Sequence, residues 1–129
     1  MELSWSILRD EVWSGGTQRV QGWDDVMQHL VMLHDRAGAL SLHIMDGPDP
    51  GPMQVSVQAE RGKYLLTLLE ATEDGTDVRS YENVTAAADT VDILGDNWSA
   101  RQLTDDFDLV VMMFKEFFET GYVSRKLLY

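Results

Sequence analysis

The stretch that decides the fold is MQVSVQAERGKYLLTLL, residues 53–69. Over residues 53–60, apolar and polar side chains alternate, which is typical of a strand with one buried face. Arg61 and Gly62 then favour a tight reversal of the chain. Over residues 64–69 nearly every side chain is apolar, which indicates a central strand that is covered on both faces. The stretch therefore predicts an antiparallel hairpin at the centre of a sheet.

The N-terminal segment predicts a second hairpin. Leu3, Trp5 and Ile7 occupy every second position, as in a strand with one buried face. The run Ser14-Gly15-Gly16 predicts the turn, because paired glycines reach positive φ angles easily. Residues 17–20 are then expected to return as a short strand.

Helix signals flank the predicted sheet. Asp24 and Asp25 stand where carboxylates cap a helix start and favour its dipole, and Gly38 is expected just after the helix end. Its apolar stripe comprises Val26, Leu30, Leu33 and Ala37. A second helix is predicted after Thr104-Asp105-Asp106 and is expected to stop at Gly121. Its stripe comprises Phe107, Val110, Val111, Phe114, Phe117 and Phe118.

The remaining segments complete an antiparallel pattern. Further strands are predicted over residues 40–44, 78–84, 91–93 and 98–103. Turns or breaks are predicted over residues 47–52, 73–76 and 95–97, a short connector over 85–89, and an edge strand in the tail 122–129. Short connections favour a meander over crossovers. We therefore expect one α+β domain over residues 1–129, an antiparallel meander of about five to seven strands with two helices packed against it.

Composition excludes several classes of protein. The 129 residues contain 22 acidic and 10 basic side chains, for a net charge of -12, and no cysteine. A chain without cysteine has no disulfide scaffold and no thiolate-ligated metal. An acidic balance argues against a nucleic-acid or membrane partner, since both need a basic footprint. No signal peptide or membrane span is recognised, so a cytoplasmic location is expected.

The negative charge is concentrated in one stretch. Residues 70–108 hold eleven carboxylates against Arg79 and Arg101, a net charge of -9. Neighbouring strands would add these potentials and steer a basic partner. The predicted partner-binding residues are Asp74, Asp77, Glu82, Asp92, Asp96 and Trp98. Helix capping and solubility explain the acids equally well, and a tryptophan in a strand is more often part of a core.

No catalytic constellation is visible, and the sequence predicts neither an enzyme nor a bound metal or cofactor. His29 and His34 are five positions apart, which places them off one helix face, and His43 is expected on the polar side of a strand. Phosphate-binding loops and the Gly-x-Ser-x-Gly nucleophile motif are absent from the sequence. Glu70, at the end of the apolar strand, is the one mild acid–base candidate.

Several segments share features with a known group. Residues 22–26 (GWDDV) open the first helix, and residues 95–98 (GDNW) precede the last one. Residues 106–121 end that helix with an aromatic–Thr–Gly sequence. In these features the chain resembles the small immunity proteins of bacterial polymorphic toxin systems, which have an α+β fold. The resemblance implies that the protein binds and neutralises a cognate, basic toxin delivered between competing bacteria.

Two alternatives stay open. One is a small enzyme that uses an acidic pocket. The other is a homo-oligomeric adaptor, joined as a homodimer through the tail 122–129 or through an exposed strand edge. Dimer formation is compatible with toxin binding, so it does not compete with the leading hypothesis.

Overall fold

Strands outnumber helices in the described part of the chain, with one α-helix early and another near the C-terminal end. The computed structural model describes residues 1–45, 51–83, 89–124 and 128. In chain order the elements are β1 (Glu2–Arg9), β2 (Val12–Arg19), α1 (Trp23–Leu33), β3 (Gly38–His43), β4 (Gly51–Glu60), β5 (Lys63–Thr72), β6 (Gly75–Ser80), β7 (Thr90–Ile93), β8 (Asp96–Ser99), the 3-10 turn η1 (Ala100–Gln102), β9 (Leu103–Thr104) and α2 (Phe107–Thr120).

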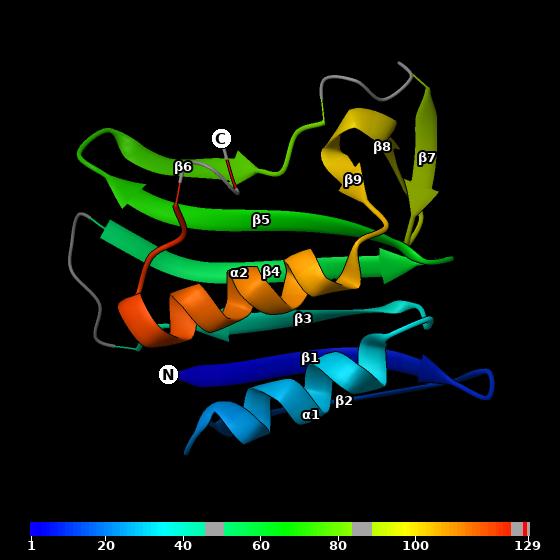
Figure 1. The fold of residues 1–129 in the computed structure, drawn as a ribbon, viewed down its shortest axis with the longest axis horizontal. Coiled ribbons are helices and arrows are strands. Elements are labelled where there is room, and N and C mark those ends of the chain that lie inside the picture. The colour runs from blue at the N-terminus through cyan, green and yellow to red at the C-terminus, as the bar shows by residue number, and fades with distance from the viewer. Residues whose placement is uncertain (46–50, 84–88, 125–127, 129) are drawn as a thin grey trace.

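One antiparallel sheet organises the described part of the chain. Its strand order is β2-β1-β3-β4-β5-β6, and β9 pairs with β5, giving a seven-stranded sheet, while β7 and β8 form a separate hairpin. This confirms the predicted α+β class and antiparallel sheet with two helices (Figure 1). Strands β3 to β6 run as the expected meander. Strand β2 departs from it, because it lies outside β1 while α1 leads back to place β3 on the other side of β1.

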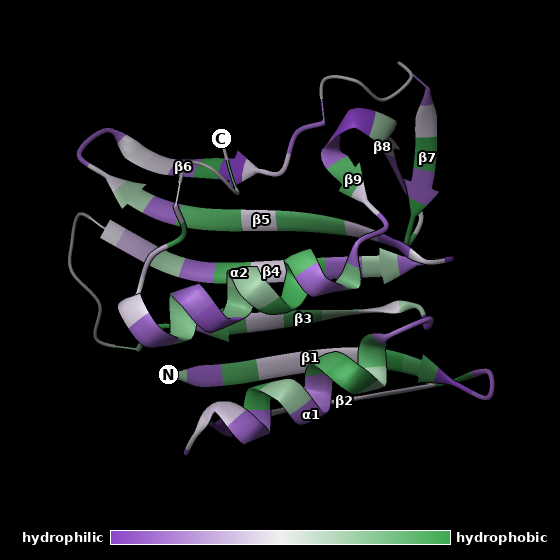
Figure 2. Cartoon of the chain, in the orientation of Figure 1, coloured by the Kyte–Doolittle hydropathy of each residue, from purple (hydrophilic) through white to green (hydrophobic). Residues whose placement is uncertain are grey.

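The pairing register aligns the core in rows. Residues directly opposite one another on neighbouring strands share one face of a sheet. Three rows cross β1, β3, β4 and β5: Leu3–Leu42–Val55–Leu68, Trp5–Leu40–Val57–Leu66 and Ile7–Gly38–Ala59–Tyr64. All of these residues except Trp5 are buried. Strand β5 is apolar over its central part, as Figure 2 shows, which agrees with its predicted central position.

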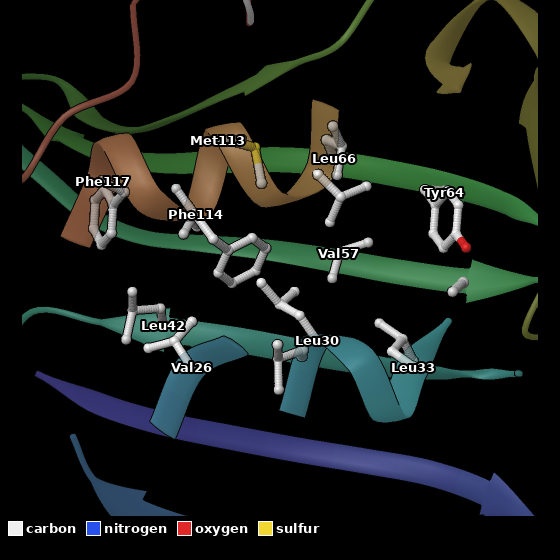
Figure 3. Close-up of a cluster of buried hydrophobic side chains, with 14 of the residues drawn as sticks. Val26, Leu30, Leu33, Leu42, Val57, Tyr64, Leu66, Met113, Phe114 and Phe117 are labelled. Atoms are coloured by element: carbon white, nitrogen blue, oxygen red, sulfur yellow. The ribbon is translucent and has the colours of Figure 1, made fainter. Parts of the chain in front are cut away.

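Both helices pack on this face of the sheet (Figure 1). Their buried side chains are Val26, Leu30 and Leu33 on α1, and Val110, Met113, Phe114 and Phe117 on α2. Figure 3 shows those that it labels pointing toward the strands and toward one another: Val26, Leu30, Leu33, Met113, Phe114 and Phe117. Each such side chain contributes on the order of 1.5–3 kcal/mol through burial. The predicted apolar stripes therefore hold the helix layer on the sheet.

The ends of α2 follow local chemistry. Asp106 caps the helix, since its carboxylate accepts hydrogen bonds from the main-chain N–H groups of Asp108 at 3.0 Å and Leu109 at 3.4 Å. Gly121 follows with a φ of 75°, and its N–H donates to the carbonyl of Phe117 at 2.7 Å. Both ends lie where the sequence predicts them.

The opposite face of the sheet is polar. A single row of hydroxyl side chains crosses all six strands, in the order Thr17, Ser4, Ser41, Ser56, Thr67 and Ser80. Ser4 and Thr17 are hydrogen-bonded at 3.2 Å, and Ser56 and Thr67 at 2.7 Å. We call this the hydroxyl row. The buried rows on one face and the hydroxyl row on the other together confirm the alternation predicted for β1, β3 and β4.

The N-terminal turn was placed wrongly by the sequence. The reversal lies at Asp10 and Glu11, with φ angles of 51° and 65°, and Gly15 and Gly16 lie inside β2. A Cβ atom on Gly15 would come within 2.6 Å of the main-chain oxygen of Trp5, and one on Gly16 within 2.8 Å of the Trp5 ring. The two glycines therefore leave room for Trp5, and they do not form the turn.

Gly38 also has a different role from the predicted one. Helix α1 ends at Leu33, so Ala37 and Gly38 lie beyond it, and Gly38 begins β3. The residue is buried, and a Cβ atom there would collide with the main-chain oxygen of Ser6. A glycine that looks like a helix stop is required here by the close approach of β1.

The C-terminal strands are shorter than predicted. Strand β6 ends at Ser80, and the predicted strand over 98–103 divides into β8, η1 and β9. The β7–β8 turn is formed by Leu94 and Gly95, which have positive φ angles, so Asp96 and Asn97 belong to β8. Parts of the predicted segments 47–52, 78–84, 85–89 and 122–129 lie outside the described residues. Within the tail, residues 122–124 and 128 are not assigned to a strand.

Candidate functional site

The predicted carboxylates lie along one long side of the molecule, the side of edge strand β6. Asp74 is in the β5–β6 turn, Asp77 is on β6, Glu82 follows β6, Asp92 is on β7 and Asp96 begins β8. In Figure 1, β6 and the β7–β8 hairpin occupy opposite ends of this side. All five side chains are exposed. We call these five residues the acidic side.

The carboxylates of the acidic side are exposed. Among the described residues, none of the five forms an ion pair or a hydrogen bond through its side chain. Helix capping does not explain them either, because both helices start elsewhere. Capping does explain Asp106, and the first turn of α2 explains Asp108. The capping explanation therefore holds for the end of the acidic stretch and fails for these five residues.

Arg79, one of the two cations in the stretch 70–108, is withdrawn from the surface. It is 6% exposed. Its Nη1 donates to the Tyr122 hydroxyl at 2.7 Å and its Nη2 to the main-chain oxygen of Leu128 at 2.6 Å. A carboxylate oxygen of Glu70 lies 3.8 Å from Nη1. The mild acid–base candidate Glu70 is thus paired with an arginine that also binds the C-terminal segment.

Trp98 packs against its own chain. With Val91 and Leu94 it lies against a second buried cluster formed by Leu65, Ile93 and Leu103. This cluster lies on the polar face, because Leu65 alternates with the core residues Tyr64 and Leu66. Trp98 is half-buried, and its main contribution here is to hold the β7–β8 hairpin against β5.

A small pocket lies between the two ends of the acidic side. Its volume is about 200 Å³. Its lining residues are Lys63, Tyr81, Asn83, Val91, Ala100, Leu103, Thr104 and Asp105. Glu82 stands between two lining residues in the sequence and Asp92 follows a third. Small-molecule sites have volumes of roughly 300–1,000 Å³, so this pocket suits a single side chain of a partner better than a cofactor.

The Lys63 and Asp105 side chains meet in this pocket. The Lys63 Nζ lies 3.7 Å from a carboxylate oxygen of Asp105, and both side chains are largely exposed. An exposed pair of this kind contributes on the order of 0–1 kcal/mol, so a stronger partner can displace it. Asp105 is therefore available to an incoming cation.

The histidines are separated from one another. The His29 ring lies 4.3 Å from the Trp5 ring, and the His34 ring lies 4.5 Å from that of Phe107. His43 alternates with the buried Leu42 and so lies on the polar face. Within the described residues, no three histidine or acidic side chains form a group that could hold a metal ion.

The pKa of the Tyr64 phenol departs from its ordinary value. Burial raises the pKa of its phenol above 10, and the negative charge of Asp35 acts in the same direction, while a main-chain hydrogen bond from Asp35 opposes both. The Tyr64 ring lies 5.8 Å from that of Phe107. These contacts hold the start of β5 under the helix layer, which is a structural role.

The pocket and the Arg79 contacts were not found in the sequence. Arg79 pairs with Leu68, so it occupies the place of an apolar side chain in a core row. A cation at a core position of a strand is a usable signal, but its partners Tyr122 and Leu128 are more than forty residues away along the chain. The pocket joins four elements and has no local pattern.

Within the described residues, neither helix has the length and apolar character needed to cross a lipid bilayer. The longer helix, α2, has 14 residues. A bilayer-spanning helix needs about 20 apolar residues.

Comparison with known proteins gives the family and a related fold. No curated protein matches the chain. A crystal structure of a hypothetical protein from Neisseria gonorrhoeae is similar, with a TM-score of 0.80 and 17% sequence identity. The match covers 95% of this chain and 89% of the other, and at this identity it shows a shared fold. A family model matches residues 9–127, and the chain therefore belongs to DUF6911, a family of unknown function.

Proposed function

We propose that this protein captures a basic protein through its acidic side and thereby neutralises it, as an immunity protein neutralises a toxin. The role is one of binding and occlusion, without a chemical reaction. The proposal rests on the surface of the molecule and on the resemblance described above. The partner is expected to be a toxin domain whose own binding groove is rich in lysine and arginine.

The observation that carries this proposal is the exposure of all five carboxylates of the acidic side, while Arg79 is buried. Residues 70–108 have a net charge of -9 with Arg79 included. Because the Arg79 guanidinium is buried in contacts with Tyr122 and Leu128, it contributes little positive potential at the surface. The Glu70 carboxylate, 3.8 Å from Nη1 and 21% exposed, is withdrawn with it, so the rest of the stretch keeps a net charge of -9, with ten carboxylates opposed by Arg101 alone. A field of this kind raises association rates by roughly 10-fold to 10³-fold.

The shape of the acidic side supports contact over a wide area. Its carboxylates come from two ends of one side, with the pocket between them. A partner that reaches both ends covers the pocket, where a lysine or arginine side chain would find Asp105. Strand β6 and the β7–β8 hairpin are both fixed to β5, so the carboxylates are held on a rigid support.

The test is co-expression with a candidate toxin domain from a neighbouring gene, followed by purification and rate measurements. We expect a complex, protection of the host cell, and an association rate that falls as salt is added. Neutralising the acidic side with Asp74→Asn, Asp77→Asn, Glu82→Gln, Asp92→Asn and Asp96→Asn should slow association by about 10-fold or more.

A matched variant controls for net charge. It changes four exposed aspartates and one exposed glutamate elsewhere: Asp10→Asn, Asp24→Asn, Asp35→Asn, Asp108→Asn and Glu119→Gln. If charge at the acidic side matters, this variant should retain more of the association rate than the first. Equal slowing by both variants, or protection that survives neutralisation of the acidic side, would contradict the proposal.

A further inference from the structure

The two edges of the sheet differ in how they are protected. Strand β6 carries the exposed Asp77 and follows the Glu73–Asp74 turn, and charges of this kind discourage other strands from pairing with an edge. Strand β2 lacks such protection. Its seven residues from Val12 to Gln18 carry no charge and no proline, and its pairing with β1 runs without a bulge.

The outer side of β2 is uncovered in the described part of the chain. Among the described strands it pairs with β1 alone, and nearly all of its residues are exposed. No described residue hydrogen-bonds to its outward main-chain groups. Val12 and Trp13 are 65% and 52% exposed, and they lie on opposite faces because successive side chains alternate. A long edge with unpaired N–H and C=O groups is a template for another strand.

The charges at the two ends of β2 indicate which strand would pair with this edge. Arg19 is the only charged residue of β2 and stands at its C-terminal end, while Asp10 and Glu11 form the turn at its N-terminal end. In an antiparallel pair of two β2 strands, the N-terminal end of each strand lies beside the C-terminal end of the other. Arg19 of each copy would then lie beside the acidic turn of the other, so the edge complements itself.

The distribution of net charge also favours a second copy at this edge. Residues 1–22 hold three carboxylates and two arginines, so two copies repel each other weakly there. The acidic edge β6 lies five inter-strand spacings away, roughly 24 Å at about 4.8 Å each. The Debye length is about 8 Å at physiological salt, so the two acidic sides would be screened from each other.

We propose that two copies of this chain pair through their β2 strands, antiparallel and centred on Gly15, to form one continuous sheet. A two-fold pair closes on itself, and the remaining edges are the charged β6 strands, so assembly stops at the dimer. The proposal does not depend on toxin binding, because the acidic side lies at the far edge of each copy.

The test is sedimentation of the full chain over a range of concentrations. We expect a species of twice the 14.6 kDa chain mass. Arg19→Glu places like charges together at both ends of the pair and should weaken the dimer by about 10-fold or more in dissociation constant. Lys115→Glu makes the same charge change on an exposed position of α2 and should leave the dimer unchanged.

A charge exchange identifies the contact itself. The double variant Arg19→Glu with Glu11→Arg should restore the dimer. Within one copy these residues lie at opposite ends of β2, roughly 27 Å apart at about 3.4 Å per residue, so recovery reports a contact between copies. A chain that remains monomeric over the whole range, or a dimer equally insensitive to all of these variants, would overturn the proposal.

Cross-linking tests the geometry without disturbing the charges. Because the chain has no cysteine, Ser14→Cys and Val78→Cys each give a single thiol, the first on β2 and the second on β6. A short thiol-specific cross-linker should join Ser14→Cys copies and leave Val78→Cys copies separate. The reverse result would assign the dimer to β6 and refute pairing through β2. Loss of dimer without loss of toxin capture, or the converse, separates this proposal from the proposed function.

Discussion

Arg79 and Tyr122 are 43 positions apart in the sequence and form a direct contact. The Arg79 Nη1 donates a hydrogen bond to the Tyr122 hydroxyl at 2.7 Å, and the guanidinium carbon lies 5.2 Å from the centre of the Tyr122 ring. A second hydrogen bond, to the main-chain oxygen of Leu128, joins the same side chain to the C-terminal segment. Edge strand β6 and this segment are therefore held together by one arginine.

Removal of this arginine should destabilise the fold strongly. Arg79→Met should lower the free energy of unfolding by about 3–5 kcal/mol, because it leaves the nearby Glu70 carboxylate without its cation. Tyr122→Phe should cost less, about 1–2 kcal/mol, since it removes one hydrogen bond. Urea denaturation measures both. Arg36→Met, at an exposed position, is the control and should change stability by less than about 0.5 kcal/mol.

Gly38 should not tolerate a side chain. Gly38→Ser should destabilise the protein by about 1–3 kcal/mol, because the added atoms meet the main chain of β1 at Ser6 and Ile7. Thermal unfolding followed by circular dichroism provides the measurement. Gly22→Ser is the matched change, since nothing lies within 4 Å of a Cβ atom there and serine caps a helix well. A similar loss in both variants would argue against the close approach of β1 and β3.

The core face of α2 should be far more sensitive than its outer face. Phe114→Ala should lower the free energy of unfolding by about 3–5 kcal/mol, because Phe114 is fully buried between the helices and the sheet. Met112→Ala, two residues earlier and 56% exposed, should cost less than about 0.5 kcal/mol. Chemical denaturation of both variants checks the prediction, and an inverted order would mean that α2 is rotated about its axis.

Alkaline pH should reveal the burial of Tyr64. Its raised pKa means that the folded protein retains the phenolic proton at a pH where the unfolded chain loses it. This contribution to stability is present below pH 10 and is lost as the pH rises through the higher pKa of the folded state. Tyr64→Phe should therefore flatten the fall in stability above pH 10, as measured by denaturation at several pH values. An unchanged slope would show that Tyr64 does not titrate in this way.

The sequence predicts the central sheet and both helices because their signals are local. Alternation from residues 53 to 60 is the β4 pattern, and the continuous apolar run that follows is central β5. Asp106 and Gly121 end α2 through contacts with residues at most four positions away. Each of these features depends on residues that are close together in the sequence.

Where a feature depends on contacts between distant segments, its prediction from the sequence was wrong or the feature was missed. Gly15, Gly16 and Gly38 have the local appearance of a turn and a helix stop, but they are required by the approach of β1. The place of β2 outside β1 follows from the path of α1 and leaves no mark in the alternation. The acidic side is still a prediction as a binding surface, although its residues do lie along one side of the molecule.

The hydroxyl row has a consequence for the entropy of folding. Serine and threonine have short side chains with few rotamers, whereas lysine, arginine and glutamate lose about 1.5–2 kcal/mol of rotamer freedom when they are immobilised. A row of short side chains from Thr17 to Ser80 lets one line across the polar face become ordered while little rotational freedom is lost. This line of the polar face is therefore ordered at a small entropic cost, while the two helices cover the opposite face and the β7–β8 hairpin packs against Leu65.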